Sequence, residues 1–275
     1  MSVPEPESTC PNPEEEESAM ARIDREGVSL YYEYHPSRKP NAPTLLLSHG
    51  YSATSAMWKG QLAALNPDYS VITWDMRGHG ESDSPEDVSL YSEKLSVEDM
   101  AALLDVCGVQ QAFIGGLSLG GYMTLAFHRV YPERCLALLL FDTGPGYKSE
   151  KARAGWNEMA SERAANLAKI GFEALNTSAE VRASTHRSVT GLINAAKGML
   201  SQFDDRIIQS LPDIALPTLV LVGAEDQPFL VPTDYMAGKI PGSRKVVIPK
   251  AGHASNIDQP DLFNKAVLEF LGEVQ

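Results

Sequence analysis

The feature that most constrains the fold is a glycine-rich segment that carries one serine between a strand-like and a helix-like stretch. Residues 116–120 read Gly-Leu-Ser-Leu-Gly, after the apolar run 112–114 and before the helix-like run 122–130. This G-x-S-x-G sequence favours a sharp strand-to-helix turn that exposes the serine hydroxyl, because glycines remove the side chains that would block so tight a turn. An ordinary loop can have the same five residues, whereas a phosphate-binding loop needs a different spacing. Ser118 is therefore the candidate nucleophile, and its partners are sought further along the chain.

A serine hydroxyl is a weak nucleophile and needs a nearby base, which in turn needs a carboxylate to orient it. In hydrolases with this turn the order along the chain is serine, then aspartate or glutamate, then histidine. The strand-like run 218–222 leads into Asp226, and the run 245–248 leads into His253. Functional groups gather at the carboxyl ends of the strands in α/β sheets. We therefore predict that His253 is the general base and that Asp226 orients it.

Two further acidic residues compete with Asp226 for this role. Glu225 precedes it in the same turn, and Asp142 ends the strand-like run 136–142, from which a carboxylate can also reach the histidine. Each of these acids can instead be a structural turn residue. Position and chain order favour Asp226.

The reaction also needs hydrogen-bond donors that stabilise the developing oxyanion. One donor is the backbone N–H of the residue after the nucleophile, here Leu119, and the other comes from the loop after the third strand. That strand is expected at residues 44–48, and its loop reaches Tyr51 three residues later. The predicted oxyanion hole consists of the backbone N–H groups of Tyr51 and Leu119.

Arg77 and His79 lie in a glycine-flanked cluster after the strand-like run 71–75. Such clusters usually brace a turn by hydrogen bonding, and the residues above already account for the chemistry. We therefore interpret both side chains as structural.

The chain alternates strand-like and helix-like stretches from residue 21 onward, which indicates right-handed crossovers and a mostly parallel sheet. An antiparallel hairpin is expected at the start, around residues 28–34. Further strands are expected near residues 44–48, 71–75, 112–116, 136–142, 218–222 and 244–248, and the expected helices include 96–107, 119–131 and 259–272.

These motifs and their order resemble the α/β-hydrolase superfamily over about residues 44–265. The chain is most similar to its serine esterase and 3-oxoadipate enol-lactonase branch, on the residues 75–80 (Asp-Met-Arg-Gly-His-Gly), 116–121, 142–143 and 255–260. The resemblance implies an α/β-hydrolase fold, in which helices flank a mostly parallel eight-stranded sheet and a helical lid follows the sixth strand. It also implies catalysis without a cofactor. The Arg-Trp signature of a true enol-lactonase is absent from residues 181–200, which leaves the substrate open.

The interval between residues 142 and 218 interrupts the alternation of strands and helices. Residues 151–175 are rich in Ala, Glu, Arg and Leu, and residues 178–199 are also compatible with helix. We predict a helical lid over residues 146–213, set into an α/β-hydrolase core formed by residues 21–145 and 214–275. Some apolar residues of this lid pack it onto the core and others line the pocket; the candidates for both roles are Trp156, Met159, Leu167, Ile170, Phe172, Leu192, Met199 and Leu200.

Negative charge is concentrated at the N-terminus. The first twenty residues contain six glutamates, four prolines and no lysine or arginine, which predicts a disordered acidic tail over residues 1–20. The formal net charge of −13 and the lack of a basic patch argue against nucleic acid as a partner.

The three cysteines, Cys10, Cys107 and Cys135, form no disulfide framework, and no Cys/His cluster has zinc-ligand spacing. The sequence has no charged-then-apolar leader and no apolar run that is long enough to span a membrane. We expect a cytoplasmic protein without a metal, a cofactor or a membrane partner. Nothing in the sequence indicates the oligomeric state.

The sequence predicts a serine hydrolase that cleaves carboxylic esters of small to medium acyl groups through an acyl-enzyme. Three alternatives stay open: a lactonase that uses the same residues on a cyclic ester, a C–C bond hydrolase of aromatic degradation, and a ligand receptor that keeps the fold without turnover. They differ mainly in the ligand, so the motifs do not separate them. The expected partner is a small-molecule ester or lactone.

Overall fold

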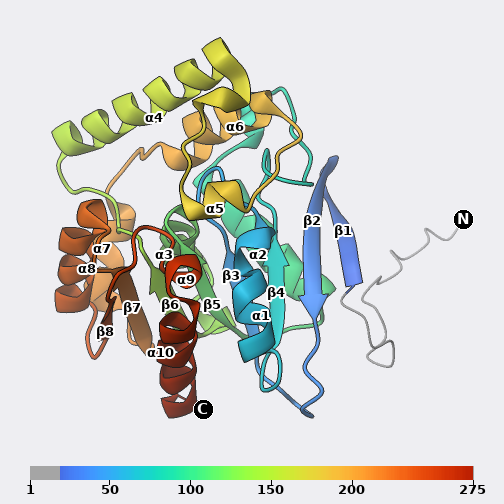
Figure 1. Cartoon of the computed structure of the whole chain (residues 1–275), viewed down its shortest axis with the longest axis vertical. Helices are drawn as coiled ribbons and strands as arrows, with labels where there is room; N and C mark the ends of the chain where they lie inside the picture. The colour runs from blue at the N-terminus through green and yellow to red at the C-terminus, as the bar shows by residue number, and fades with distance from the viewer. Residues whose placement is uncertain (1–18, 275) are drawn as a thin grey trace, which may run out of the picture.

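A computed structural model describes residues 19–274, which contain one mixed sheet of eight strands (Figure 1). The strand order is β1-β2-β4-β3-β5-β6-β7-β8. The pairs β1–β2 and β2–β4 are antiparallel, and all other pairs are parallel. The mostly parallel eight-stranded sheet and its opening hairpin are therefore confirmed. The strands are β1 (Ala19–Arg25), β2 (Val28–His35), β3 (Thr44–Ser48), β4 (Ser70–Trp74), β5 (Ala112–Leu117), β6 (Cys135–Phe141), β7 (Thr218–Gly223) and β8 (Arg244–Ile248).

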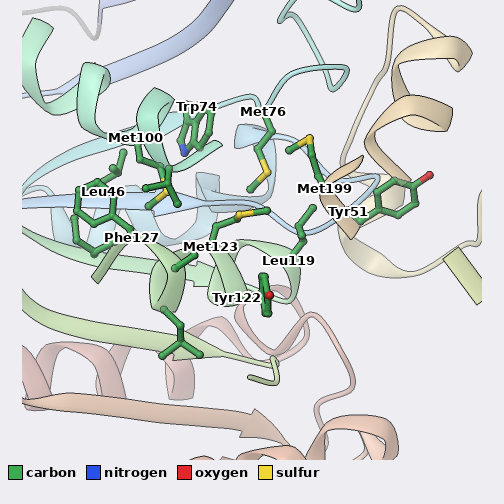
Figure 2. Close-up of a cluster of buried hydrophobic side chains, with 14 of the residues drawn as sticks. Leu46, Tyr51, Trp74, Met76, Met100, Leu119, Tyr122, Met123, Phe127 and Met199 are labelled. Atoms are coloured by element: carbon green, nitrogen blue, oxygen red, sulfur yellow. The ribbon is translucent and has the colours of Figure 1, made fainter. Parts of the chain in front are cut away.

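Helices cover both faces of the sheet because the side chains of its central strands alternate between two hydrophobic clusters. In β3, Leu46 belongs to one cluster, and Leu45 and Leu47 belong to the other. Figure 2 shows part of the first cluster, where Met100 and Met123 lie near these strands. The helices of this face are α2 (Glu93–Val106), α3 (Leu119–Val130) and α8 (Gln227–Lys239), and those of the opposite face are α1 (Lys59–Leu65) and α10 (Pro260–Glu273), with the short α9 (Ser255–Asp258) before α10.

Two helices differ from the expected ones, and a capping residue explains the first difference. Helix α2 begins three residues before residue 96, because the Ser92 hydroxyl caps it by accepting a hydrogen bond from the Leu95 N–H at 3.1 Å. Helix α8 was not among the helices named above, and it contains Pro228 near its start and Pro232 in its interior. Its Pro228 lies in the first turn, where the missing N–H has no intrahelical partner to lose.

The interval between β6 and β7 is helical, and Figure 1 shows its α4, α5 and α6 beyond one edge of the sheet. Leu167, Leu192 and Met199 from this interval join the hydrophobic cluster that covers α2 and α3, whereas Ile170 and Phe172 are exposed. The apolar residues of this segment thus divide between packing and surface. Its elements are α4 (Glu150–Ile170), η4 (Gly171–Ala174), α5 (Ala179–Arg182), α6 (Val189–Ala195), η5 (Ala196–Leu200), α7 (Arg206–Ser210) and η6 (Leu211–Asp213).

The acidic tail expected at residues 1–20 falls mostly outside the described residues, as does Cys10. Strand β1 begins at Ala19, so the last two residues of that range belong to the sheet. Cys107 and Cys135 are buried, and neither is in a disulfide within the described residues. Within residues 19–274, no helix combines the length and the apolar character needed to cross a membrane.

Two glycine-to-alanine substitutions test the packing of α3 on the sheet. A Cβ at Gly120 would overlap the carbonyl oxygen of Ser48 in β3, whereas a Cβ at Gly155 in α4 has nothing within 4 Å. We expect Gly120→Ala to lower the free energy of unfolding by about 3 kcal/mol, since α3 must move away from the strand. Gly155→Ala is the matched control and should raise it by up to about 1 kcal/mol. Urea unfolding measures both, and equal midpoints for Gly120→Ala and the wild type would show that the close approach is wrong.

Candidate active site

Ser118 lies at the turn between β5 and α3 in a strained backbone conformation. Its φ is 55° and its ψ is −115°, a region that residues other than glycine rarely adopt. The Ser118 N–H donates to the Phe141 carbonyl oxygen at 2.9 Å, and the Ser118 carbonyl oxygen accepts from the Thr143 hydroxyl at 2.6 Å. The end of β6 therefore holds the strained turn from both sides. The side chain is only partly buried and borders a pocket.

The glycines around Ser118 permit contact between α3 and the neighbouring segments. A Cβ at Gly116 would overlap the backbone of Gly120 one turn later, and a Cβ at Gly121 would lie 2.5 Å from the Thr143 side chain. In both cases the added Cβ would lie far inside van der Waals contact. The glycine spacing is thus required by packing as well as by the turn itself.

His253 and Asp226 form a hydrogen-bonded pair at the carboxyl ends of β8 and β7. The His253 Nδ1–H donates to the Asp226 Oδ2 at 2.8 Å. Asp226 is buried at the start of α8, whereas the neighbouring Glu225 is exposed. The ring of Phe229 stacks on the imidazole at 4.9 Å between centroids. The structure therefore pairs His253 with Asp226, and Glu225 points to solvent.

The pKa of His253 reflects two opposing effects. Burial lowers this pKa because it disfavours the charged imidazolium, while the hydrogen bond and the negative charge of Asp226 raise it. The result is a pKa above the ordinary value for histidine. A base in this state is well suited to accept a proton near neutral pH.

Asp142, the third candidate acid, is hydrogen-bonded elsewhere. It is fully buried, and it accepts a hydrogen bond from the Gly223 N–H at 2.7 Å and another from the Ser255 hydroxyl. Burial raises the pKa of its carboxyl to about 7, although both hydrogen bonds act in the opposite direction. Asp142 thus ties β6 to β7 and to the turn that follows His253.

The two predicted oxyanion donors lie on segments that meet beside Ser118. Leu119 is the first residue of α3, where backbone N–H groups have no partner within the helix. A Cβ at Gly50 would lie 3.4 Å from the Ser118 Cβ, so the loop before Tyr51 runs against the serine. The Tyr51 side chain extends away toward α6, and its hydroxyl donates to the Leu192 carbonyl oxygen at 3.0 Å (Figure 2). Only the main chain of Tyr51 is therefore available to the site.

Two neutral histidines hold the loop that contains Tyr51. The His49 Nδ1–H donates to the Gly50 carbonyl oxygen at 2.7 Å, and burial lowers the pKa of His49 to about 3. From the interval between β6 and β7, the His186 Nε2–H donates to the Ser52 carbonyl oxygen at 3.0 Å, and burial again lowers the pKa. His186 does not follow a strand-like run in the sequence, so no local sequence pattern predicts its contact with Ser52.

Arg77 braces the turn after β4, in agreement with its structural interpretation. Its guanidinium forms hydrogen bonds of 2.6 and 2.8 Å with the two carboxylate oxygens of Asp99 in α2. Both side chains are buried. His79 is buried as well, with its Nδ1 at 3.1 Å from the Arg77 carbonyl oxygen.

An open pocket borders Ser118, and its volume is about 620 Å³ with the adjoining solvent space included. Four segments line it: the start of α3, the loop after β6, the α4–η5 region and the first turns of α8. No lysine, arginine, aspartate or glutamate is among the described residues that line it. The lining residues are Ser118, Leu119, Tyr122, Thr143, Gly144, Pro145, Gly146, Tyr147, Trp156, Leu200, Gln202, Pro228, Phe229 and Pro232.

Sequence reasoning missed Phe229 and Gln202 in this pocket. Phe229 follows Asp226 by less than one helical turn, so the position of the acid offers some signal for it. Gln202 has no motif around it, and only the packing of the chain brings it to Ser118. Across residues 19–274, no three His, Cys, Asp or Glu side chains are grouped as a metal site would require.

The family model described as "Alpha/beta hydrolase family" matches residues 45–266, so the chain belongs to the α/β-hydrolase family. Its curated relatives include 3-oxoadipate enol-lactonase 1 of Acinetobacter baylyi, 28% identical over 86% of this chain and 91% of the relative. A provisionally named 2-succinyl-6-hydroxy-2,4-cyclohexadiene-1-carboxylate synthase of Bacillus subtilis is 29% identical over 86% of this chain and 93% of the relative. Among solved structures, a thermophilic esterase from Thermogutta terrifontis matches with a TM-score of 0.79 and 28% identity over 94% of this chain and 99% of its own.

An NMR titration of the histidine Cε1–H signals tests the link between Asp226 and His253. Replacing Asp226 with asparagine removes the negative charge that raises the pKa of His253 while burial still lowers it. We expect the pKa of His253 to fall in Asp226→Asn. The pKa of His128, which burial alone lowers, should stay unchanged as the internal control. An unchanged or higher pKa for His253 would contradict the assigned pairing.

Proposed function

We propose that this protein is a serine hydrolase that cleaves carboxylic esters of small to medium acyl groups. One observation carries the proposal: a strained, accessible Ser118 borders an apolar pocket. Phe229 lines the same pocket, and its ring stacks on His253, which is hydrogen-bonded to Asp226. Acyl transfer needs a nucleophile, an acid and a base, and this chain has them in the order that is typical of hydrolases with such a turn. Membership of the α/β-hydrolase family agrees with it.

The proposed mechanism assigns one role to each residue. His253, oriented by Asp226, removes the proton of Ser118 as its hydroxyl attacks the ester carbonyl carbon. The backbone N–H groups of Tyr51 and Leu119 stabilise the negative charge that develops on the carbonyl oxygen. His253 then protonates the departing alcohol, and it activates the water that releases the acid from the acyl-enzyme.

The lining of the pocket supports an uncharged substrate. No cationic side chain is among its described residues, and a carboxylate moved from water into such a site would lose hydration without gaining a partner. The names of the relatives from Bacillus and Acinetobacter refer to a carboxylate and to an oxoadipate lactone. This chain, by contrast, is proposed to act on neutral acyl groups, as a simple esterase does.

We also propose that residues 146–213 act as a lid. Trp156, Leu200 and Gln202 from this interval line the pocket above Ser118. A substrate would therefore be covered by the lid on one side and by α3 and α8 on the other. Exclusion of water at such a site strengthens the hydrogen bonds to the oxyanion.

A lactonase is the second candidate, favoured by the 28% identity to the Acinetobacter enol-lactonase. A cyclic ester presents the same carbonyl to the same nucleophile, so the residue roles do not change. The two functions differ only in which substrate has the larger kcat/KM. A shared panel of 4-nitrophenyl esters and lactones decides between them.

The first test is hydrolysis of 4-nitrophenyl esters from acetate to decanoate by the wild type and by Ser118→Ala. We expect an optimum at short to medium chains and a loss of roughly 10³-fold or more in kcat for the alanine variant, because the nucleophile is gone. Circular dichroism and thermal unfolding serve as the folding control. An alanine variant as active as the wild type would refute the proposal.

A matched pair of neighbouring acids tests the role of Asp226. Asp226→Asn should reduce kcat roughly 10⁴-fold, because the imidazole is no longer held as the correct tautomer beside a negative charge. Glu225→Gln removes the adjacent, exposed carboxylate and should change kcat less than about twofold. Steady-state kinetics on the best ester measures both. Equal losses in the two variants would disprove the assignment of the acid.

A further inference from the structure

Gln202 carries an unsatisfied hydrogen-bond acceptor and lines the same pocket as Ser118. The residue is only 8% exposed, and its side chain lines the same pocket as Ser118. The Gln202 Oε1 is buried, and no group among the described residues donates a hydrogen bond to it. A buried carbonyl oxygen without a donor is unfavourable and uncommon in a folded protein. Where it lies in a pocket, a ligand can satisfy it.

The backbone of Gln202 is held in place by α4. The Gln202 N–H donates to the Asn157 Oδ1 at 2.8 Å, and the Asn157 Nδ2 donates to the Gln202 carbonyl oxygen at 2.8 Å. The adjacent Trp156 Nε1–H donates to the Leu200 carbonyl oxygen, also at 2.8 Å. These three bonds fix the segment that carries the Gln202 amide. A group positioned in this way can select ligands by geometry.

The loop after β6 leaves room for the amide. Gly146 has a φ of +82°, and a Cβ at this position would lie 2.8 Å from the Gln202 Oε1. A side chain at residue 146 would therefore displace the amide in addition to straining the backbone. The absence of a side chain at Gly146 therefore leaves space for the amide oxygen of this pocket-lining residue.

Three donors of the pocket lining already have acceptors. The Tyr122 hydroxyl donates to Glu93 at 3.0 Å, and the Thr143 hydroxyl donates to the Ser118 carbonyl oxygen. The Trp156 N–H is bound to Leu200. None of these three groups is free to turn toward the Gln202 Oε1.

We infer that Gln202 accepts a hydrogen bond from a hydroxyl or amide N–H of the substrate, so that the preferred ester carries such a donor on an otherwise uncharged chain. This inference rests on the proposed function and names its substrate class. An ammonium group is a poorer match, because no carboxylate lines the pocket to balance its charge. A site built to bind a hydroxyl also disfavours an analogue that lacks it, since the polar group of the protein is then left unpaired.

The test compares three 4-nitrophenyl esters with the same four-carbon acyl chain: butyrate, 3-hydroxybutyrate and 3-methoxybutyrate. Hexanoate and 6-hydroxyhexanoate repeat the comparison of parent and hydroxy ester on a longer chain. The methoxy ester keeps the oxygen but cannot donate a hydrogen bond. For the wild type we expect kcat/KM to be about tenfold higher for at least one hydroxy ester than for its parent, as one buried hydrogen bond implies. The methoxy ester should gain nothing. This comparison needs no variant and is independent of any effect on folding.

Two variants assign the preference to the amide. Gln202→Leu should lower the ratio of hydroxy ester to parent ester to about one or less, because no acceptor remains to be satisfied. Gln209→Leu makes the same substitution at an exposed position of α7 outside the pocket and should leave the ratio unchanged. Thermal unfolding of both variants checks that they are folded.

The outcomes separate the inference from the proposed function. Serine-dependent hydrolysis with equal kcat/KM for hydroxy and parent esters in the wild type overturns the inference alone. A preference for the hydroxy ester that persists in Gln202→Leu also overturns the inference, because another group then binds the hydroxyl. Hydrolysis that survives in Ser118→Ala overturns the proposed function, and the inference falls with it.

Discussion

The close contact between α3 and the strands beneath it is the constraint on which the rest of the site depends. At Gly116 and Gly120 any side chain would overlap a neighbouring backbone. That contact forces the chain through a sharp turn, and Ser118 occupies a positive φ that the hydrogen bonds to Phe141 and Thr143 maintain. Because the turn starts a helix, its first N–H groups are also left free beside the serine. A single packing requirement thus presents the hydroxyl together with the backbone N–H that is proposed as one oxyanion donor.

Burial controls the charge state of the groups around this turn. It keeps His49 and His186 neutral, and as neutral donors they hold the loop that contains Tyr51. His253 is the exception, because the adjacent carboxylate of Asp226 outweighs burial and raises its pKa. Two kinds of histidine therefore coexist in one region: neutral ones that support the backbone and one that is poised to take up a proton.

The segment between β6 and β7 contributes apolar side chains and one amide to the lining of the pocket. Its helix α4 contributes Trp156 to the lining and uses Asn157 to hold the backbone of Gln202. The core carries the groups proposed to react, while this segment adds apolar surface and one amide. This division explains how relatives of one fold are named for different reactions. The segment between β6 and β7 can therefore vary the lining without moving the turn at Ser118.

The sequence by itself determined the sheet, the turn at Ser118 and the order of the serine, the acid and the histidine, because alternating apolar residues and glycine spacing act over a few neighbouring residues. Only the tertiary structure decided which acid meets His253: Asp226 is buried against it, and the adjacent Glu225 is exposed. It also decided the roles of residues without a motif. The contact of His186 with Ser52 spans 134 positions and that of Asn157 with Gln202 spans 45. Such contacts arise from the packing of whole elements, which no local pattern encodes.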